Sequence, residues 1–297
     1  MIGPIHTKRA IKFVTGRLAV FQHMVSRVGL QQHACILTYH RIADINFIDS
    51  HFDDWNVHPK IFERQIKAAT EFGTVIPLMD LPSKLKSNES PDRPWVCLTF
   101  DDGFANFLLN AVPILKKYNA HATLFVPTSQ IGGTKPMPFD RWGNRHQYTM
   151  DDVAWRPLTW DELTLCLDSE VVSIGSHSHQ HLNAIDCSAE QLSGEAARSR
   201  DILVSKLGRQ VASMYAYPYG CTRLGQAGNS YVAAVKQEGY ELAVSTNLGM
   251  ASKFSDSYLF PRIEAHSLDS PAVIRAKLSG SLAGYFLSDR FRKSRRG

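Results

Sequence analysis

Several features are scarce in this chain of 297 residues, and each absence narrows what the protein can be. No run approaches the roughly 18 apolar residues of a membrane-spanning helix, and no internal repeat or low-complexity tract is evident. The five cysteines are scattered, odd in number and without a Cys-x-x-Cys pair, which indicates reduced thiols rather than a disulfide framework. The N-terminus lacks the compact apolar core and small-residue cleavage site of a signal peptide. Together these absences predict a cytoplasmic protein.

Charge of one sign is not in large excess either. The 33 Lys and Arg against 28 Asp and Glu leave a net charge of +5, which is too small to argue for a nucleic-acid partner. Basic residues do gather at both ends of the chain, and residues 286–297 are predicted to be a basic tail. The intervening residues 34–285 are long enough to form one large domain.

Residues 1–33 are predicted to form a basic amphipathic helix. Their apolar side chains alternate between spacings of three and four, at Ile11, Val14, Leu18, Phe21, Val25 and Val28. Two interpretations are open. The apolar stripe packs on the domain, or the helix lies on an anionic membrane surface and gives the protein a peripheral contact with the inner face of the membrane.

Short apolar runs alternate with helical patterns through the rest of the chain. Strands are predicted at 34–39, 95–100, 121–126, 171–175, 211–217 and 241–245, and helices at 58–72, 105–118, 159–167, 188–207, 231–238 and after Pro271. This alternation predicts an α/β architecture with parallel strands. The long irregular segment 128–156 has the length of a functional lid.

Two polar motifs follow predicted strands. Asp101 and Asp102 come directly after the run 95–100. His177 and His181 follow the strand at 171–175, and their spacing puts both imidazoles on one face of a helical turn. One carboxylate and two imidazoles are a suitable ligand set for a zinc-like ion, and the other carboxylate is free to act as a base. Taken alone, each motif also fits a plain interpretation, namely a solvated Asp-Asp-Gly turn and an ordinary pair of histidines.

Together the motifs resemble those of the polysaccharide deacetylases, carbohydrate esterase family 4. The run Thr-Phe-Asp-Asp-Gly at 99–103 is similar to the family's first motif, His-Ser-x-x-His at 177–181 to its second, and Pro-Tyr-Gly at 218–220 to the end of its third. The resemblance extends over about residues 34 to 265. It implies a distorted, incomplete (β/α) barrel and a metal-dependent hydrolase that removes N-acetyl groups from the sugars of a glycan or its precursor.

The resemblance also implies roles for single residues. Asp102, His177 and His181 would bind the metal, most simply Zn²⁺, with Co²⁺, Ni²⁺ or Fe²⁺ also accepted by this ligand set. Asp101 would be the general base toward a metal-activated water. The backbone N–H of Tyr219 would help to stabilise the oxyanion.

The chain departs from the family pattern at two places. Ala216 stands where many members have an arginine that orients the base, and Arg262 is the candidate to replace it, although a surface ion pair is an equally good interpretation of that residue. No late motif supplies the usual acid. Instead Tyr39-His40 resembles the early Tyr-His segment of the subgroup that acts on poly-N-acetylglucosamine, which implies His40 as the acid.

The substrate itself is not readable from the sequence. Tyr219 and Trp142 are candidates for stacking on sugar rings, although aromatic residues also serve as ordinary packing. Two alternative functions stay open. One is a deformylase or amidase on a lipid-linked sugar at the membrane surface, suggested by the basic N-terminal segment. The other is a non-catalytic glycan-binding relative.

Overall fold

The computed structural model describes residues 33–45, 55–87, 91–148, 151–208 and 211–281. Residues 1–32 of the predicted N-terminal helix and the predicted basic tail lie outside these ranges, so both, like the cytoplasmic location, stay predictions, whereas His33 begins a strand instead. Within the described ranges, no helix is both long and apolar enough to cross a membrane.

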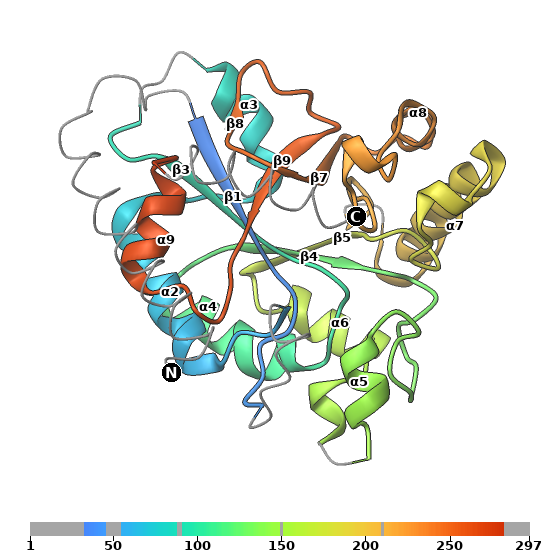
Figure 1. Ribbon diagram of the computed structural model, residues 1–297, viewed down its shortest axis with the longest axis horizontal. Helices are drawn as coiled ribbons and strands as arrows, with labels where there is room; N and C mark the ends of the chain where they lie inside the picture. The colour runs from blue at the N-terminus through green and yellow to red at the C-terminus, as the bar shows by residue number, and fades with distance from the viewer. Residues whose placement is uncertain (1–32, 46–54, 88–90, 149–150, 209–210, 282–297) are drawn as a thin grey trace, which may run out of the picture.

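Seven parallel strands form a closed barrel (Figure 1). They are β1 (His33–Tyr39), β3 (Trp95–Phe100), β4 (Ala122–Val126), β5 (Val172–Ser176), β6 (Met214–Ala216), β7 (Leu242–Leu248) and β9 (Phe260–Glu264). The ring closes because β1 pairs with β3 along one edge and with β9 along the other. Pairing is uneven, since β1 and β3 match over their whole length whereas β5 and β6 meet only at Ser176 and Tyr215. The predicted distorted, incomplete (β/α) barrel is therefore confirmed.

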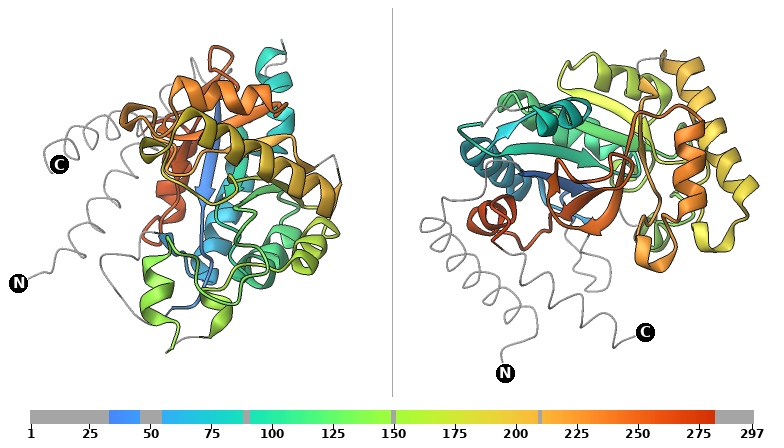
Figure 2. Two further views of the ribbon diagram at one scale, coloured as in Figure 1. Left: turned by 90° about the vertical axis from the view of Figure 1, so that its right-hand side faces the viewer. Right: turned by 90° about the horizontal axis from the view of Figure 1, so that it is seen from above.

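Helices surround the barrel on its outer side, as the view from above in Figure 2 makes plain. They are α2 (Pro59–Phe72), α4 (Val112–Lys117), α6 (Trp160–Leu167), α7 (Ala189–Leu207), α8 (Asn229–Gln237) and α9 (Pro271–Leu278). Smaller elements complete the described structure, namely α3 (Leu81–Lys86), α5 (Arg141–His146) and the two-residue strands β2 (Thr74–Val75) and β8 (Ala251–Ser252).

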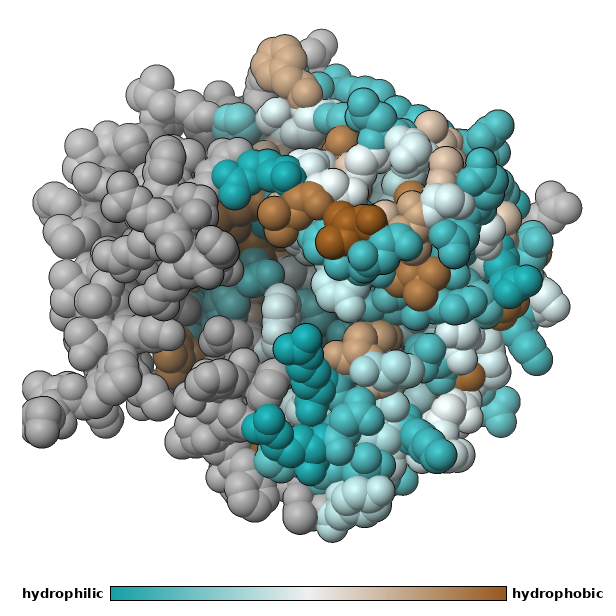
Figure 3. All heavy atoms as spheres, turned by 45° about the vertical axis from the view of Figure 1, so that its right-hand side comes forward, coloured by the Kyte–Doolittle hydropathy of each residue, from teal (hydrophilic) through white to brown (hydrophobic). Residues whose placement is uncertain are grey.

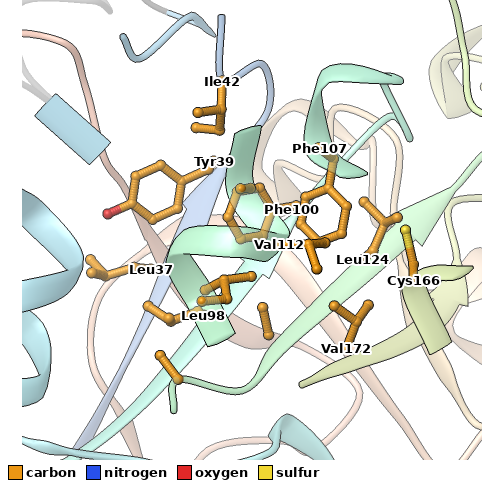
Figure 4. Packing of buried hydrophobic residues seen from close by; sticks show 14 of the residues in the cluster. Leu37, Tyr39, Ile42, Leu98, Phe100, Phe107, Val112, Leu124, Cys166 and Val172 are labelled. Atoms are coloured by element: carbon orange, nitrogen blue, oxygen red, sulfur yellow. The ribbon is translucent and has the colours of Figure 1, made fainter. Parts of the chain in front are cut away.

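Alternate residues of each strand enter two different cores, because successive side chains of a strand point to opposite faces. On β1, Ile36 belongs to the cluster that fills the barrel, together with side chains from β3, β4, β6, β7 and β9. Its neighbour Leu37 belongs to the larger cluster between the barrel and the helices. In that outer layer the rings of Tyr39, Phe100 and Phe107 lie in a row (Figure 4), with centroids 5.2 and 4.7 Å apart.

The sequence-based helix at 105–118 exists in a modified form. It begins as a π-helical turn, Phe107–Ala111, and continues as α4, with Pro113 in the first turn of that helix. The preceding π-helical turn accommodates the proline, because it interrupts the regular i to i−4 hydrogen bonding that a proline cannot join. The strand β9 was missed by sequence reasoning, because Pro261 and Arg262 interrupt its apolar pattern.

The surface of the described residues is dominated by hydrophilic side chains on the face that Figure 3 presents, with apolar residues between them. Most large apolar side chains lie in the cores instead. The exceptions include two half-exposed aromatic side chains, Trp55 and Tyr219, which are 45% and 44% exposed. Both lie beside the residues described next.

Candidate active site

The carboxyl ends of the parallel strands deliver the predicted site residues to one end of the barrel. His40 follows β1, Asp101 and Asp102 follow β3, and His177 follows β5. In a barrel of parallel strands these ends share one face, where catalytic groups assemble. The sequence therefore predicted correctly that residues far apart in the chain would meet.

Asp101 forms a bidentate ion pair with Arg262. The two terminal guanidinium nitrogens donate to Oδ1 at 2.8 Å and to Oδ2 at 2.7 Å. Both side chains are buried, at 3% and 2% exposure. A fork of this kind fixes the direction of the carboxylate as well as its charge. The structure thus brings Arg262 to the place that the sequence analysis had proposed for it.

Arg262 reaches Asp101 through the inside of the barrel. Its Nε donates to the carbonyl oxygen of Ser245, and one terminal nitrogen also contacts the hydroxyls of Thr38 and Thr99 at 3.0 and 3.3 Å. These partners come from β7, β1 and β3, so three strands hold the guanidinium. A buried arginine needs such partners, because leaving its donors unpaired would be costly.

The environment of Asp101 keeps it ionised. Burial raises the pKa of its carboxyl, but the charge and hydrogen bonds of Arg262, aided by His177, outweigh that effect and leave the pKa below its usual range. An ionised carboxylate held at a fixed angle is able to accept a proton, since Arg262 occupies only some of its lone pairs.

Asp102, His177 and His181 form a second group immediately beside the first. One potential ligand atom from each lies within 4.8 Å of the others, and all three residues are buried. Asp102 Oδ1 lies 3.5 Å from Nε2 of His177 and 3.4 Å from Nε2 of His181. Ligands bound at about 2.1 Å around a tetrahedral ion are about 3.4 Å apart, so these separations fit a metal site.

The protonation states of these side chains also favour binding of a cation. His177 Nδ1 lies 2.8 Å from the carbonyl oxygen of Ala216, an acceptor that needs the proton on Nδ1 and so leaves the Nε2 lone pair free. Burial lowers the pKa of His177 to about 4. For Asp102, burial raises the pKa, but the interaction with His181 and the charges of nearby imidazoles lower it well below its usual range. A neutral imidazole and an ionised carboxylate are what metal binding requires.

The backbone around Asp102 explains the glycine of the first motif. Asp102 has φ 74° and Gly103 has φ 70°, so the chain makes two successive left-handed steps after β3. A Cβ at position 103 would lie 3.0 Å from a Val126 methyl group, in a conformation that L residues rarely adopt. Strain of this kind is common at functional sites.

The loop from His177 to His181 is held from within and from α7. Ser178 has φ 64°, and its hydroxyl accepts from the backbone N–H of His181 at 2.9 Å. The buried carboxylate of Glu195 accepts from the backbone N–H groups of His179 and Gln180. Sequence reasoning missed Glu195, because a single glutamate on a long helix carries no local signal of the loop it meets.

His40 lies beside Asp101, just after the end of β1. Its Nε2 is 4.0 Å from Asp101 Oδ2, and its side chain is 17% exposed. The ring of Trp55 contacts the His40 ring with centroids 4.5 Å apart at 65°. Trp55 is a second residue that sequence reasoning missed, since it lies outside every motif.

Tyr219 lies beside the ligand group. Its ring contacts His181 with centroids 5.1 Å apart, and its backbone has φ 59°. The Thr246 hydroxyl donates to the Tyr219 carbonyl oxygen at 2.5 Å, which holds this peptide in place. Among the described residues the amide N–H of Tyr219 has no acceptor, so it is available to a bound oxygen.

Trp142 does not occupy the place expected of a sugar-binding residue. Its side chain is only 3% exposed, and its ring lies against the Arg41 guanidinium at 4.5 Å. The segment 128–156 is also more ordered than its composition indicated, because it contains α5 and a 3₁₀ turn at Asp152–Ala154. Trp142 packs this segment on the barrel rather than facing solvent.

Comparison with known proteins agrees with this site. Residues 88–243 match the polysaccharide deacetylase family, and the chain belongs to that family. The matched region contains both carboxylates, both ligand histidines and Tyr219, whereas His40 and Arg262 lie outside it. The protein is therefore a hydrolase of amide carbon–nitrogen bonds, of the polysaccharide deacetylase type.

Similar proteins support the assignment. The chain is 26% identical over 254 residues to YxkH of Bacillus subtilis (strain 168), covering 85% of this chain and 75% of that protein. It is 24% identical to the poly-beta-1,6-N-acetyl-D-glucosamine N-deacetylase of Staphylococcus aureus (strain MRSA252), covering 78% and 79%. Among solved structures, the Streptococcus pyogenes deacetylase PplD in complex with acetate matches with 25% identity and a TM-score of 0.66, covering 83% of this chain and 98% of that one.

Proposed function

We propose that this protein is a metal-dependent N-deacetylase that releases acetate from N-acetylated sugars of a glycan or its precursor. One observation supports this most directly. A carboxylate paired with arginine, Asp101, lies beside a three-residue ligand group in which Asp102 approaches both imidazoles within 3.5 Å. This arrangement separates a proton acceptor from a cation site, as amide hydrolysis requires.

Asp101 takes the role of the base. Its carboxylate accepts a proton from the water that attacks the acyl carbon, and the fork of Arg262 keeps the carboxylate aimed throughout. Arg262 also balances the negative charge of Asp101 in a buried place, which would otherwise favour the protonated form. The fork therefore does the orienting that an arginine at position 216 would do in other members.

Asp102, His177 and His181 would hold the metal, most simply Zn²⁺, with Co²⁺, Ni²⁺ or Fe²⁺ also compatible with the donor set. When bound, such an ion supplies electrophilic activation of a water and of the acyl oxygen. The free amide N–H of Tyr219 donates a hydrogen bond to the oxygen on which negative charge develops.

His40 takes the role of the acid. It gives the proton at Nε2 to the amine nitrogen as the carbon–nitrogen bond breaks, and its position 4.0 Å from Asp101 places this acid next to the base. The His40 ring is restrained by Trp55, which lies against it. Water adds its hydroxyl to the acyl carbon and gives its other hydrogen to Asp101 as a proton, while His40 protonates the amine; transfer of the proton from Asp101 to His40 then restores both groups.

The substrate class follows from the half-exposed aromatic rings at the rim and from the similar proteins. Tyr219 contacts His181 and Trp55 contacts His40, so both offer flat apolar surfaces next to the reacting groups, and such surfaces suit the apolar face of a sugar ring. The relative from Staphylococcus aureus bears the name of an enzyme that acts on a polymer of N-acetylglucosamine. Oligomers of β-1,6-linked N-acetylglucosamine are therefore the first substrates to test.

The test measures acetate and free amine together. The full chain is stripped with a chelator, reloaded with Zn²⁺, and incubated with N-acetylglucosamine oligomers and with an O-acetylated glycan. We expect equal amounts of acetate and new amine from the N-acetylated oligomers, only after metal is restored. Acetate without amine, or release that is indifferent to the chelator, would contradict the proposal.

A further inference from the structure

The two ligand histidines are held in different ways. Nδ1 of His177 lies 2.8 Å from the carbonyl oxygen of Ala216, which is the usual way to fix the ring of a metal-binding histidine. Nδ1 of His181 is buried and has no hydrogen-bond partner among the described residues. The second torsion of a histidine side chain has broad, roughly two-fold preferences, so His181 needs another restraint to keep its Nε2 directed at the cation.

A phenylalanine ring supplies that restraint. Phe139 stacks on His181 with centroids 3.7 Å apart and ring planes 20° from parallel. The rings of His177 and Tyr219 contact His181 edge-on, at 4.8 and 5.1 Å. Rotation of the His181 ring out of its plane would drive its atoms into Phe139, because the two faces are already in van der Waals contact.

Phe139 is in turn held by its neighbour in sequence. Asp140 Oδ2 accepts from Arg41 at 2.5 Å, while Oδ1 accepts from the backbone N–H of Gly143 at the start of α5. Arg41 is 2% exposed, so this ion pair is shielded from water. Phe139, which stacks on His181, is therefore the direct chain neighbour of a residue in a buried ion pair.

Arg41 also contacts a second part of the segment that carries Phe139. Its Nε donates to the carbonyl oxygen of Ala154 at 2.6 Å, and its guanidinium lies over the rings of Phe104 and Trp142. Arg41 itself comes directly after His40 at the end of β1. The Arg41 side chain therefore binds the segment to the barrel at residues 140 and 154.

We propose that Phe139 is a positioning residue for the ligand histidine His181, and that the buried Arg41–Asp140 pair holds Phe139 in place. The aromatic stack does for His181 what the Ala216 carbonyl does for His177. This inference depends on the proposed function only in taking Asp102, His177 and His181 as the metal site. It assigns the long segment a structural part in metal binding, distinct from covering the substrate.

The experiment measures Zn²⁺ affinity of the full chain by competition with a chromophoric chelator. We expect Phe139→Leu to weaken affinity about 10-fold or more, the usual effect of removing a group that orients a metal ligand. Phe139→Tyr keeps the stacked ring and should stay within twofold of wild type. Asp140→Asn should also weaken binding, and adding it to Phe139→Leu should cause little further loss, because both act through one contact.

Arg156→Lys is the matched control. Arg156 forms a bidentate pair with Glu162 at the end of the same segment and has no contact with Phe139 among the described residues. Its loss should lower the melting temperature and leave Zn²⁺ affinity unchanged.

Three outcomes would overturn the inference. The first is an unchanged affinity in Phe139→Leu while the wild type binds Zn²⁺ and releases acetate, which leaves the proposed function standing. The second is equal weakening by Phe139→Tyr and Phe139→Leu, which also leaves the proposed function standing. The third is a wild-type chain that binds no Zn²⁺, which removes the metal site and the proposed function with it.

Discussion

The two halves of the candidate site are built from different interactions. In the base half, Asp101 is tied to Arg262 by two charged hydrogen bonds inside the barrel. In the ligand half, the atoms of Asp102, His177 and His181 that face one another are 3.4–3.5 Å apart across each carboxylate–imidazole pair, and a loop and aromatic contacts hold the rings. In the base half, the charge of Asp101 is balanced by Arg262. In the ligand half, one carboxylate and two imidazoles direct lone pairs to a place that suits an added cation.

Because of this difference, only one half should depend on metal. The base half should keep its geometry when metal is removed, because Asp101 is held by Arg262, a residue of the protein itself. The ligand half places a carboxylate and two imidazoles in a buried space, where a cation is the natural complement. Substitutions in the two halves should consequently separate activity from metal content.

The largest expected effect comes from changing the two neighbouring carboxylates one at a time. Asp101→Asn should lower kcat by about 10³-fold, within the usual range for losing a general base, and should retain Zn²⁺. Asp102→Asn should lose both activity and Zn²⁺, because it removes a charged ligand. Acetate release and metal content after dialysis check both outcomes. Zinc lost from the first variant, or kept by the second, would reverse the assigned roles.

His40→Gln tests the acid on the base side and should have the next largest effect. We expect kcat to fall about 10²-fold with Zn²⁺ content unchanged, since His40 lies by Asp101 and outside the ligand group. His33→Gln is the control, because His33 is an exposed histidine at the other end of the same strand. Loss of zinc from His40→Gln would instead make His40 a ligand.

Arg262→Lys should weaken only the base half. Lysine keeps the charge but not the planar fork, so we expect kcat to fall about 10-fold with Zn²⁺ retained. Arg262→Met should be destabilised by about 3–5 kcal/mol in urea unfolding, because Asp101 is left as a buried, unpaired charge. Arg275→Lys, at an exposed pair with Glu71, serves as the control and should change stability by less than about 1 kcal/mol. Full activity in Arg262→Lys would show that the fork is not needed.

Trp55→Leu should give the smallest effect and the most specific one. Loss of an aromatic surface for a sugar ring costs about 0.5–1.5 kcal/mol, so KM for an oligomer should rise about 2- to 12-fold. Phe254→Leu removes another exposed aromatic ring, which lies outside the site, and should leave KM unchanged. Steady-state kinetics on long and short oligomers measure this, and an equal change with a single-sugar substrate would point to an effect through His40.

Part of the site was readable because its residues are local in sequence. The motifs at 99–103 and 177–181 each lie within one strand end and the following turn, so their placement and their joint resemblance to a known family predicted that they belong together. Arg262 was identifiable only as a candidate. Its strand was missed, since a proline and a charged residue within a buried run do not follow strand patterning.

Residues that act through long-range contacts carried no such signal. Arg41 and Asp140 are 99 positions apart and meet only because the segment after β4 folds back over the end of β1. Glu195 and Phe139 likewise touch the ligand loop from other elements. The same cause explains the wrong expectation for Trp142, because exposure depends on what packs over a ring and not on its position in a loop.

From the sequence, the adjacent carboxylates after an apolar strand and the two spaced histidines indicate the kinds of ligand and base available, and their joint resemblance to a known family identifies the chemistry. The alternation of strand and helix patterns indicates a parallel α/β architecture, and the same resemblance narrows it to the barrel. Tertiary contacts determine which arginine meets Asp101, which ring restrains His181 and which aromatic side chains stay exposed. Those choices depend on closure of the barrel and on contacts between distant segments, and no local pattern in the chain encodes them.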